Sequence, residues 1–263
     1  CDAYDIDVYA WINPLRITYT GSTFADLPED HVAKTHPDWV IRYGSMYYFD
    51  PGIPQLRTYI ASAAAEIAAN YDVTGIAFDD YFYPTTDAAV DAVQFAASGT
   101  ADLAAWRRQN VTALVAKVYR TVKAADPTLR FGISPQGNPD NDLDQQYSDV
   151  TAWLAAGGEE KVIDYLCPQV YWGYGFTLHS GSTRFAFENI VPAWLSYPRA
   201  GDVALYFGLG AYRVRRREPG QRIRLEHRQC TGGAGKGLTA AGGGRLGAVP
   251  LRQSVRAGGS RAG

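Results

Sequence analysis

The chain has 263 residues, of which 46% are hydrophobic and 20% charged, and its formal net charge is -2. This length and composition fit one large α/β domain. No membrane-spanning helix is expected, because no apolar run approaches the roughly 18 to 20 residues that such a helix needs to cross a bilayer.

The small net charge hides an uneven distribution. Residues 213–263 contain 12 Lys and Arg but 2 Asp and Glu, so the preceding part of the chain holds 13 basic and 25 acidic side chains. The body is therefore strongly acidic and the tail strongly basic. An acidic body disfavours nucleic acid as a partner of the folded part.

Apolar, β-branched segments alternate with segments of helical periodicity along the body. The apolar segments predict strands at 6–12, 73–78, 129–134, 162–172 and 202–210. Helical periodicity separates them at 54–71, 101–126, 147–157 and 185–197. This alternation predicts parallel strands joined by helices.

The helix predicted at 101–126 has one apolar face. The side chains that share this face are Val111, Leu114, Val115, Val118 and Val122. We expect Arg107 and Arg108 on its water-facing side.

Polar and aromatic side chains stand at the carboxyl end of nearly every predicted strand. They are Trp11, Asn13 and Arg16; Asp79 to Tyr83; Ser134 and Gln136; Gln169, Tyr171 and Trp172; and Tyr212. A TIM barrel gathers such loops on one face, whereas a doubly wound sheet binds its ligand at one crevice. No glycine-rich phosphate loop follows an early strand. The pattern favours the barrel.

Seven blocks of sequence have a familiar order and spacing. They read "VYAWINPLR", "HPDWV", "YFDPGIPQLRTYI", "GIAFDDYFYP", "WRRQNV", "FGISPQGN" and "YLCPQVYW". Together they resemble the glycosyl hydrolase-like 10 family of bacterial TIM-barrel glycosidases, from about Asp7 to Tyr212. The resemblance implies an incomplete (β/α)8 barrel over residues 1–212, in which the five predicted strands correspond to strands three to seven.

Three positions depart from the family pattern. The family usually has His at the position of Tyr9 and an aromatic residue at that of Gln136, and it often has Asn at that of Asp50. We expect these changes to affect substrate preference more than the class of reaction.

The adjacent acids Asp79 and Asp80 are the predicted catalytic residues. A glycosidase needs a proton donor and a group that stabilises the cationic sugar, and in most families both are carboxyl groups. Successive side chains of a regular strand point to opposite faces, so both acids reach one site only if the strand bends. Asp79 is predicted as the donor and Asp80 as its orienting or stabilising partner.

Nine further residues are predicted to bind substrate: Trp11, Asn13, Arg16, Tyr81, Tyr83, Gln136, Gln169, Tyr171 and Trp172. The aromatic members are equally compatible with core packing. Arg16 is compatible either with an ion pair to Asp50 or with holding the catalytic acid.

The same region is also similar to the "DGIDIDWEYP" signature of chitinase-type hydrolases, with Phe82 near the place of their catalytic glutamate. Gln169 and Tyr171 resemble the polar residues that hold the substrate acetamido group in those enzymes. Attack by the substrate's own acetamido group therefore stays open as an alternative mechanism.

The resemblance implies a glycoside hydrolase of a bacterial envelope or extracellular polysaccharide, with aminosugar glycans such as peptidoglycan favoured. It implies an extracellular or cell-envelope location. No metal or organic cofactor is expected for such an enzyme, and His31 and His36 lack metal-ligand spacing. A non-catalytic carbohydrate-binding barrel is the first alternative, and nucleic-acid binding through the basic tail is the second.

Residues 213–263 differ in composition from the rest of the chain. They contain no Phe, Trp, Tyr or Asp, and Arg, Gly and Ala predominate. We interpret this tail as the product of a shifted reading frame. A disordered basic arm is the alternative, since this composition buries too little apolar area to offset the entropy of ordering.

Overall fold

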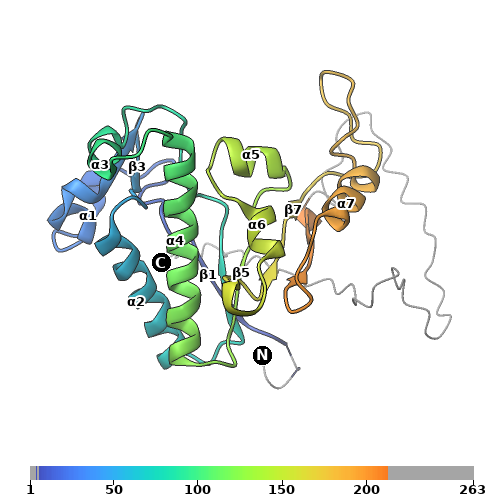
Figure 1. The fold of residues 1–263 in the computed structure, drawn as a ribbon, viewed down its shortest axis with the longest axis horizontal. Coiled ribbons are helices and arrows are strands. Elements are labelled where there is room, and N and C mark those ends of the chain that lie inside the picture. The colour runs from blue at the N-terminus through green and yellow to red at the C-terminus, as the bar shows by residue number, and fades with distance from the viewer. Residues whose placement is uncertain (1–3, 5, 213–263) are drawn as a thin grey trace, which may run out of the picture.

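The computed structural model describes residue 4 and residues 6–212 (Figure 1). The strands are β1 (Tyr9–Ile12), β2 (Val40–Tyr43), β3 (Met46–Phe49), β4 (Gly75–Phe78), β5 (Arg130–Ile133), β6 (Tyr165–Leu166), β7 (Gln169–Val170), β8 (Ala204–Leu205) and β9 (Gly208–Leu209). The α-helices are α1 (Val32–Thr35), α2 (Pro54–Asn70), α3 (Ala92–Ser98), α4 (Leu103–Ala125), α5 (Pro139–Asp144), α6 (Val150–Ala155) and α7 (Phe187–Ser196). The predictions for the tail, 213–263, lie outside the described residues.

Five parallel strands form the main sheet, in the order β1-β4-β5-β6-β8. The predicted α/β class with a parallel sheet is therefore confirmed. Each new strand along the chain is added on the same side of the previous one, without the reversal of order that defines a doubly wound sheet. The strands of the described part do not close into a barrel.

Two segments predicted as single strands are each divided in two. The segment 162–172 becomes β6 and β7, separated by Cys167 and Pro168, and the segment 202–210 becomes β8 and β9. Proline has no N–H to donate to a strand ladder, which accounts for the break beside it. Beyond the break, β7 and β9 pair with each other as a separate two-stranded parallel sheet.

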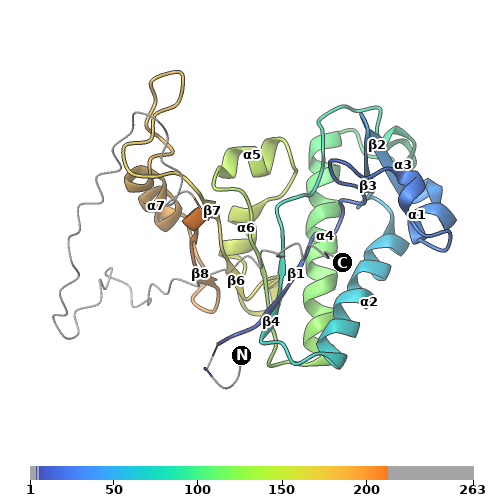
Figure 2. The ribbon, with the colours of Figure 1, turned by 180° about the vertical axis from the view of Figure 1, so that it is seen from behind.

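Helices α2 and α4 lie side by side and cover one face of the sheet (Figure 1). Helix α2 begins at Pro54, whose fixed φ suits a first turn, and the Asp102 carboxylate caps α4 by accepting from the Ala105 N–H at 2.9 Å. Figure 2 shows the opposite face, where the strands stand in front of α4. In the described part of the chain, no helix has the length and apolar character to cross a bilayer.

The β2–β3 hairpin is absent from the sequence-based prediction. Its strands mix exposed and buried side chains without a clean alternation, so the period-two signal is weak. The hairpin turn contains Gly44 at a φ of +61°, a conformation that favours glycine. Through a backbone bridge between Arg16 and Tyr48, the hairpin supports the loop that follows β1.

The prediction for Arg107 is wrong, because this side chain is fully buried. Its guanidinium donates to both carboxylate oxygens of Asp91, at 2.8 and 2.6 Å, and to the Tyr147 hydroxyl at 3.1 Å. Arg107 lies four residues before Val111, so helical periodicity places it on the buried face of α4. The ion pair ties the long connection after β4 to this helix.

Candidate active site

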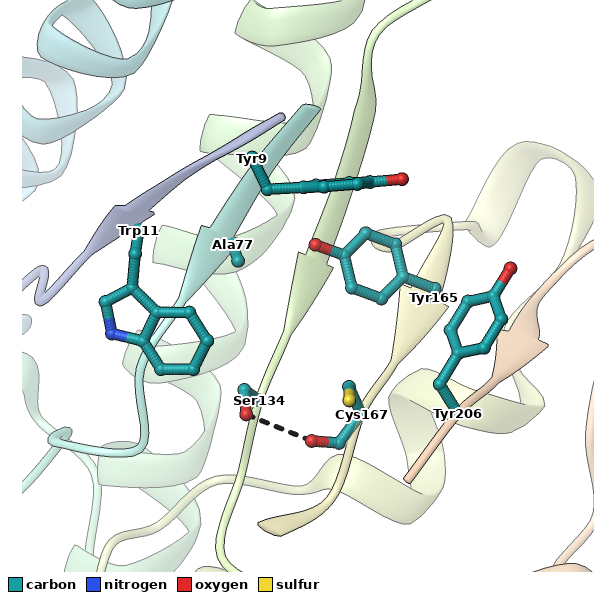
Figure 3. A pocket seen from close by; sticks show the side chains of 7 residues that line it. All are labelled: Tyr9, Trp11, Ala77, Ser134, Tyr165, Cys167 and Tyr206. Carbon is teal, nitrogen blue, oxygen red and sulfur yellow. Dashed lines mark hydrogen bonds between the residues drawn. The ribbon is translucent and has the colours of Figure 1, made fainter. Parts of the chain in front are cut away.

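The face of the sheet that α2 and α4 leave open carries a hollow lined mostly by aromatic side chains (Figure 3). Its lining residues are Tyr9, Trp11, Ala77, Ser134, Tyr165, Cys167 and Tyr206. Strand alternation directs these side chains to one side while Phe78 and Phe131 enter the core on the other. A Cβ at Gly132 would lie 2.5 Å from the Tyr165 ring, so the glycine lets this ring lie flat against the sheet.

At the carboxyl end of β4, Asp79 is held in a defined position. Its N–H donates to the Ile12 carbonyl at 2.9 Å, which extends the pairing with β1 by one residue. Its Oδ1 accepts from the Asp80 N–H at 2.9 Å and from Gln169 Nε2 at 3.0 Å. Gln169 Nε2 also donates to the Ser134 carbonyl at 3.0 Å, so the ends of β1, β4 and β5 and the start of β7 meet around Asp79.

Asp80 has an environment that favours its protonated form. Burial raises its pKa to about 7, and the hydrogen bond and the negative charge of Asp79 act in the same direction. The nearby Arg16 lowers the pKa, but its effect is smaller. The pair therefore exchanges a proton near neutral pH, as a general acid requires.

Three predicted binding residues surround this pair. The Arg16 Cζ lies 3.8 Å from the centre of the Tyr81 ring, and Arg16 lowers the Asp80 pKa. Burial and the charges of Asp79 and Asp80 raise the pKa of Tyr171 to about 12, so its hydroxyl stays protonated. The structure thus brings Arg16, Tyr81 and Tyr171 to the carboxyl pair.

A third carboxyl group, Asp142, was missed by the sequence analysis. It lies in α5, after β5, with 1% of its surface exposed. Its Oδ1 accepts from the Gln136 N–H at 3.2 Å, and its Oδ2 is buried without a partner among the described residues. Burial, aided by the charge of Asp80, raises its pKa well above the usual range. Asn138-Pro139, a helix-start signal after a strand, was the available clue.

Two predicted binding residues pack against other aromatic rings of the protein. Tyr83 is buried, with its ring edge-on to Tyr147 at 5.3 Å and the Arg107 Cζ 4.9 Å from its centre. Trp172 stacks on Phe185 at 4.7 Å. Tyr83 is therefore enclosed in the core, whereas Trp172 is partly buried and keeps some exposed surface.

The remaining predicted residues lie at the edge of this arrangement. Trp11 is 41% exposed and lines the hollow. Asn13 Oδ1 accepts from the Arg16 N–H at 3.1 Å, which shapes the turn after β1. Gln136 lies beside Gln169 through a backbone bridge, and its side chain accepts from Asn141. The alternative Arg16–Asp50 ion pair does not form, because Asp50 is buried and accepts from the Gly52 N–H.

The two histidines of the α1 region have structural contacts. His31 caps α1 by accepting from the Ala33 N–H at 3.1 Å, and His36 stacks on Trp39 at 4.2 Å. Within residues 6–212, no three side chains of His, Cys, Asp or Glu are grouped so that they could hold a metal ion.

Comparison with known proteins gives consistent findings. The profile of the family described as "Glycosyl hydrolase-like 10" matches residues 3–221. Glycosyl hydrolase YngK of Bacillus subtilis (strain 168) is 35% identical in an alignment 231 residues long that covers 80% of this chain and 43% of YngK. Glycosyl hydrolase DigH of Escherichia coli (strain K12) is 30% identical in an alignment 234 residues long that covers 79% of this chain and 51% of DigH.

The chain thus spans about half the length of the curated relatives it matches. Among solved structures, the glycoside hydrolase domain of PgaB (BpsB) from Bordetella bronchiseptica aligns with 76% of this chain and 70% of its own. The sequence identity is 14% and the TM-score 0.43.

Proposed function

Because the chain belongs to the glycosyl hydrolase-like 10 family, we propose that Asp79 and Asp80 are the carboxyl pair of a glycoside hydrolase site. The observation that carries the proposal is the shared environment of these two groups at a strand end. Asp79 is fixed by two N–H donors, and the Asp80 pKa is raised to about 7. Such a pair separates one group that keeps a proton from one that stabilises positive charge.

The electrostatics support a division of roles opposite to the one predicted from sequence. Asp80 carries the raised pKa, so it is assigned as the proton donor to the leaving oxygen. Asp79 accepts hydrogen bonds at Oδ1 and can present its other oxygen to the cationic sugar centre. This proposal differs from the sequence-based one, in which Asp79 is the donor and Asp80 its partner.

Substrate-assisted attack is the second mechanism to consider. Gln169 has two amide hydrogens, and its Nε2 already donates to Asp79 and to the Ser134 carbonyl. It therefore has no donor left for a substrate acetamido group unless this arrangement changes. Tyr171, whose hydroxyl stays protonated beside the pair, is the better candidate for that contact.

We further propose that the sheet is an arc of a (β/α)8 barrel and that the substrate is an aminosugar glycan such as peptidoglycan. The unreversed strand order and the gathering of site residues at the carboxyl ends of the strands support the barrel. The exposed Trp11 beside an aromatic hollow supports a sugar ligand. An extracellular or cell-envelope location is part of this proposal.

The test measures new reducing ends released from purified glycan strands and from N-acetylglucosamine oligomers. Asp80→Asn should lower the rate by about 10² to 10⁴ while glycan binding persists, since general acid catalysis contributes roughly this factor. Asp79→Asn should also lower it. Asp87→Asn is the matched control, because Asp87 is an exposed acid on the same connection.

Two results would contradict the proposal. One is a hydrolysis rate in Asp80→Asn equal to that in Asp87→Asn. The other is glycan binding by the unmodified chain without any hydrolysis, which would favour the non-catalytic carbohydrate-binding barrel.

A further inference from the structure

The guanidinium of Arg16 stands beside the carboxyl pair with its donors unused. Its Cζ lies 3.8 Å from the centre of the Tyr81 ring. Among the described residues it forms no ion pair, and its side chain donates no hydrogen bond. Arg107, by contrast, places its donors on Asp91, Tyr147 and backbone carbonyls.

The backbone of Arg16 is well fixed. Its N–H donates to Asn13 Oδ1 at 3.1 Å, and it forms an antiparallel bridge with the buried Tyr48 of β3. The guanidinium is planar and its N–H groups point outward in that plane. The Arg16 guanidinium, which lies over the Tyr81 ring, therefore keeps its N–H donors available at the edge of the stacked pair.

The neighbouring acid does not satisfy these donors. Arg16 lowers the pKa of Asp80, yet burial and Asp79 outweigh it, and the Asp80 pKa is still raised to about 7. A group that is neutral for much of the time is a weak partner for a permanent cation. A carboxylate on a ligand can instead accept two parallel N–H bonds from the guanidinium.

The charge of the whole body limits what this ligand can be. The acidic body repels a densely charged polyanion, but at physiological salt this repulsion is screened beyond about 8 Å. One carboxylate that reaches Arg16 is affected mainly by the groups next to it. The arrangement fits a sugar that carries a single acid group, within a glycan of otherwise neutral units.

We propose that Arg16 and Tyr81 recognise a carboxylate borne by the sugar that binds beside Asp79 and Asp80. This inference rests on the proposed function, because it takes a glycan to be the ligand of that site. Two kinds of sugar supply such a group: a muramic acid, through its lactyl ether, and a uronic acid, through its ring carbon. Tyr81 is 38% exposed, so a ligand can reach the edge of the stack.

The experiment titrates the chain with matched tetrasaccharides at pH 7.5 by calorimetry. One contains N-acetylmuramic acid with free lactyl carboxylates, the second is its neutral methyl amide, the third contains glucuronic acid, and the fourth is the N-acetylglucosamine tetramer. We expect one carboxylated ligand to bind about tenfold or more tightly than its neutral counterparts, as a charge-assisted pair predicts. Whichever acid is preferred identifies the source of the carboxylate.

Variants of Arg16 connect this preference to the side chain. Arg16→Met should remove the preference, so that the carboxylated glycans bind no more tightly than the neutral ones. Arg16→Lys should keep part of it, since lysine retains the charge but not the planar fork. Arg42→Met is the matched control, because Arg42 is an exposed arginine of the β2–β3 hairpin whose Cζ also lies near an aromatic ring, 5.8 Å from that of Tyr47. Thermal unfolding of each variant shows that it is folded.

Equal affinity of the unmodified chain for carboxylated and neutral glycans would overturn the inference, as would a preference that survives in Arg16→Met. Hydrolysis of the neutral tetramer is measured on the same samples. Hydrolysis without a carboxylate preference leaves the proposed function standing and removes the role of Arg16. A carboxylate preference without hydrolysis supports the role of Arg16 in binding and contradicts the proposed hydrolase function.

Discussion

Two acidic side chains on the connection that follows β4 illustrate two ways of burying a carboxyl group. Asp91 lies in the core, and both of its oxygens accept from the Arg107 guanidinium. Asp80 lies at the strand end beside another acid, and its raised pKa reflects burial without an ion pair. Asp91 thus serves as a permanently charged partner of Arg107, whereas Asp80 can gain and lose a proton near neutral pH.

The difference lies in the partner each acid receives. A buried charge is tolerated when a counter-charge and hydrogen bonds replace its lost hydration, and it is neutralised when they do not. The Arg107 cluster joins the β4 connection to α4, while the carboxyl pair lies at the carboxyl end of β4, where both side chains are half-buried. The acid without a counter-charge, Asp80, is thus the one that can gain or lose a proton near neutral pH.

The largest expected effect is on the buried ion pair. Arg107→Met should lower the free energy of unfolding by about 3 to 5 kcal/mol, because it leaves the Asp91 charge buried without a partner. Denaturant unfolding measures the change. The control is Asp140→Ala, which removes the exposed Arg184–Asp140 pair and should cost about 0 to 1 kcal/mol. Equal losses in both variants would erase the contrast between the regions.

The next effect is a pH dependence that comes from the carboxyl pair. The Asp80 pKa is about 7 in the folded chain against a usual 3.8, so the folded state keeps a proton that the unfolded state loses first. Stability should therefore fall as pH rises from about 4 to about 7, by at most roughly 1.4 kcal/mol per pH unit for this one proton. Asp80→Asn should reduce that slope in denaturant unfolding at several pH values. An unchanged slope would contradict the assignment.

Asp142 offers a smaller and complementary test. Asp142→Asn keeps an oxygen for the Gln136 N–H and removes a carboxyl that resists ionisation, so the free energy of unfolding at pH 7 should change by less than about 1 kcal/mol. Asp91→Asn, which weakens the Arg107 pair, should cost several times more. Similar losses at the two positions would show that Asp142 is a structural charge like Asp91.

The smallest effect concerns the aromatic surface next to the pair. Trp11→Ala should weaken glycan binding by several-fold, in line with the roughly 0.5 to 1.5 kcal/mol that a well-placed ring contact adds beyond area burial. The buried Tyr83 is the contrasting position: Tyr83→Phe should leave glycan affinity unchanged. Affinity measured by calorimetry decides this, and a loss at Tyr83 alone would reverse the assignment.

The sequence predicted those elements whose signal is local. Helices α2 and α4 lie within the ranges expected from apolar periodicity, and β4 and β5 follow the apolar runs at 73–78 and 129–134. The hairpin β2–β3 and the short α5 escaped, because their signals are weak or brief. The division of the segment 162–172 was readable from Pro168, a residue that cannot donate to a ladder.

The site was only partly predictable from the residues. The position of Asp79 and Asp80 at a strand end follows from the sequence, but which of them keeps a proton depends on burial and on neighbours distant in the chain. The burial of Arg107, by contrast, could have been predicted from sequence, because its spacing to Val111 and Leu114 places it on the buried face of the helix. Asp142 required the folded arrangement, because nothing in its own segment relates it to Asp80.

The interruption at Pro168 has a consequence for how such a protein can diverge. Before Pro168, backbone hydrogen bonds join the five strands into one sheet; after it, β7 and β9 form a separate two-stranded sheet, which a single bridge between Gln136 and Gln169 links to the loop after β5. Residues that follow Pro168, such as Gln169 and Tyr171, can therefore be replaced without breaking the backbone hydrogen bonds of the five-stranded sheet. The five-stranded sheet then acts as a stable base, and new ligand preferences can arise in β7 and β9.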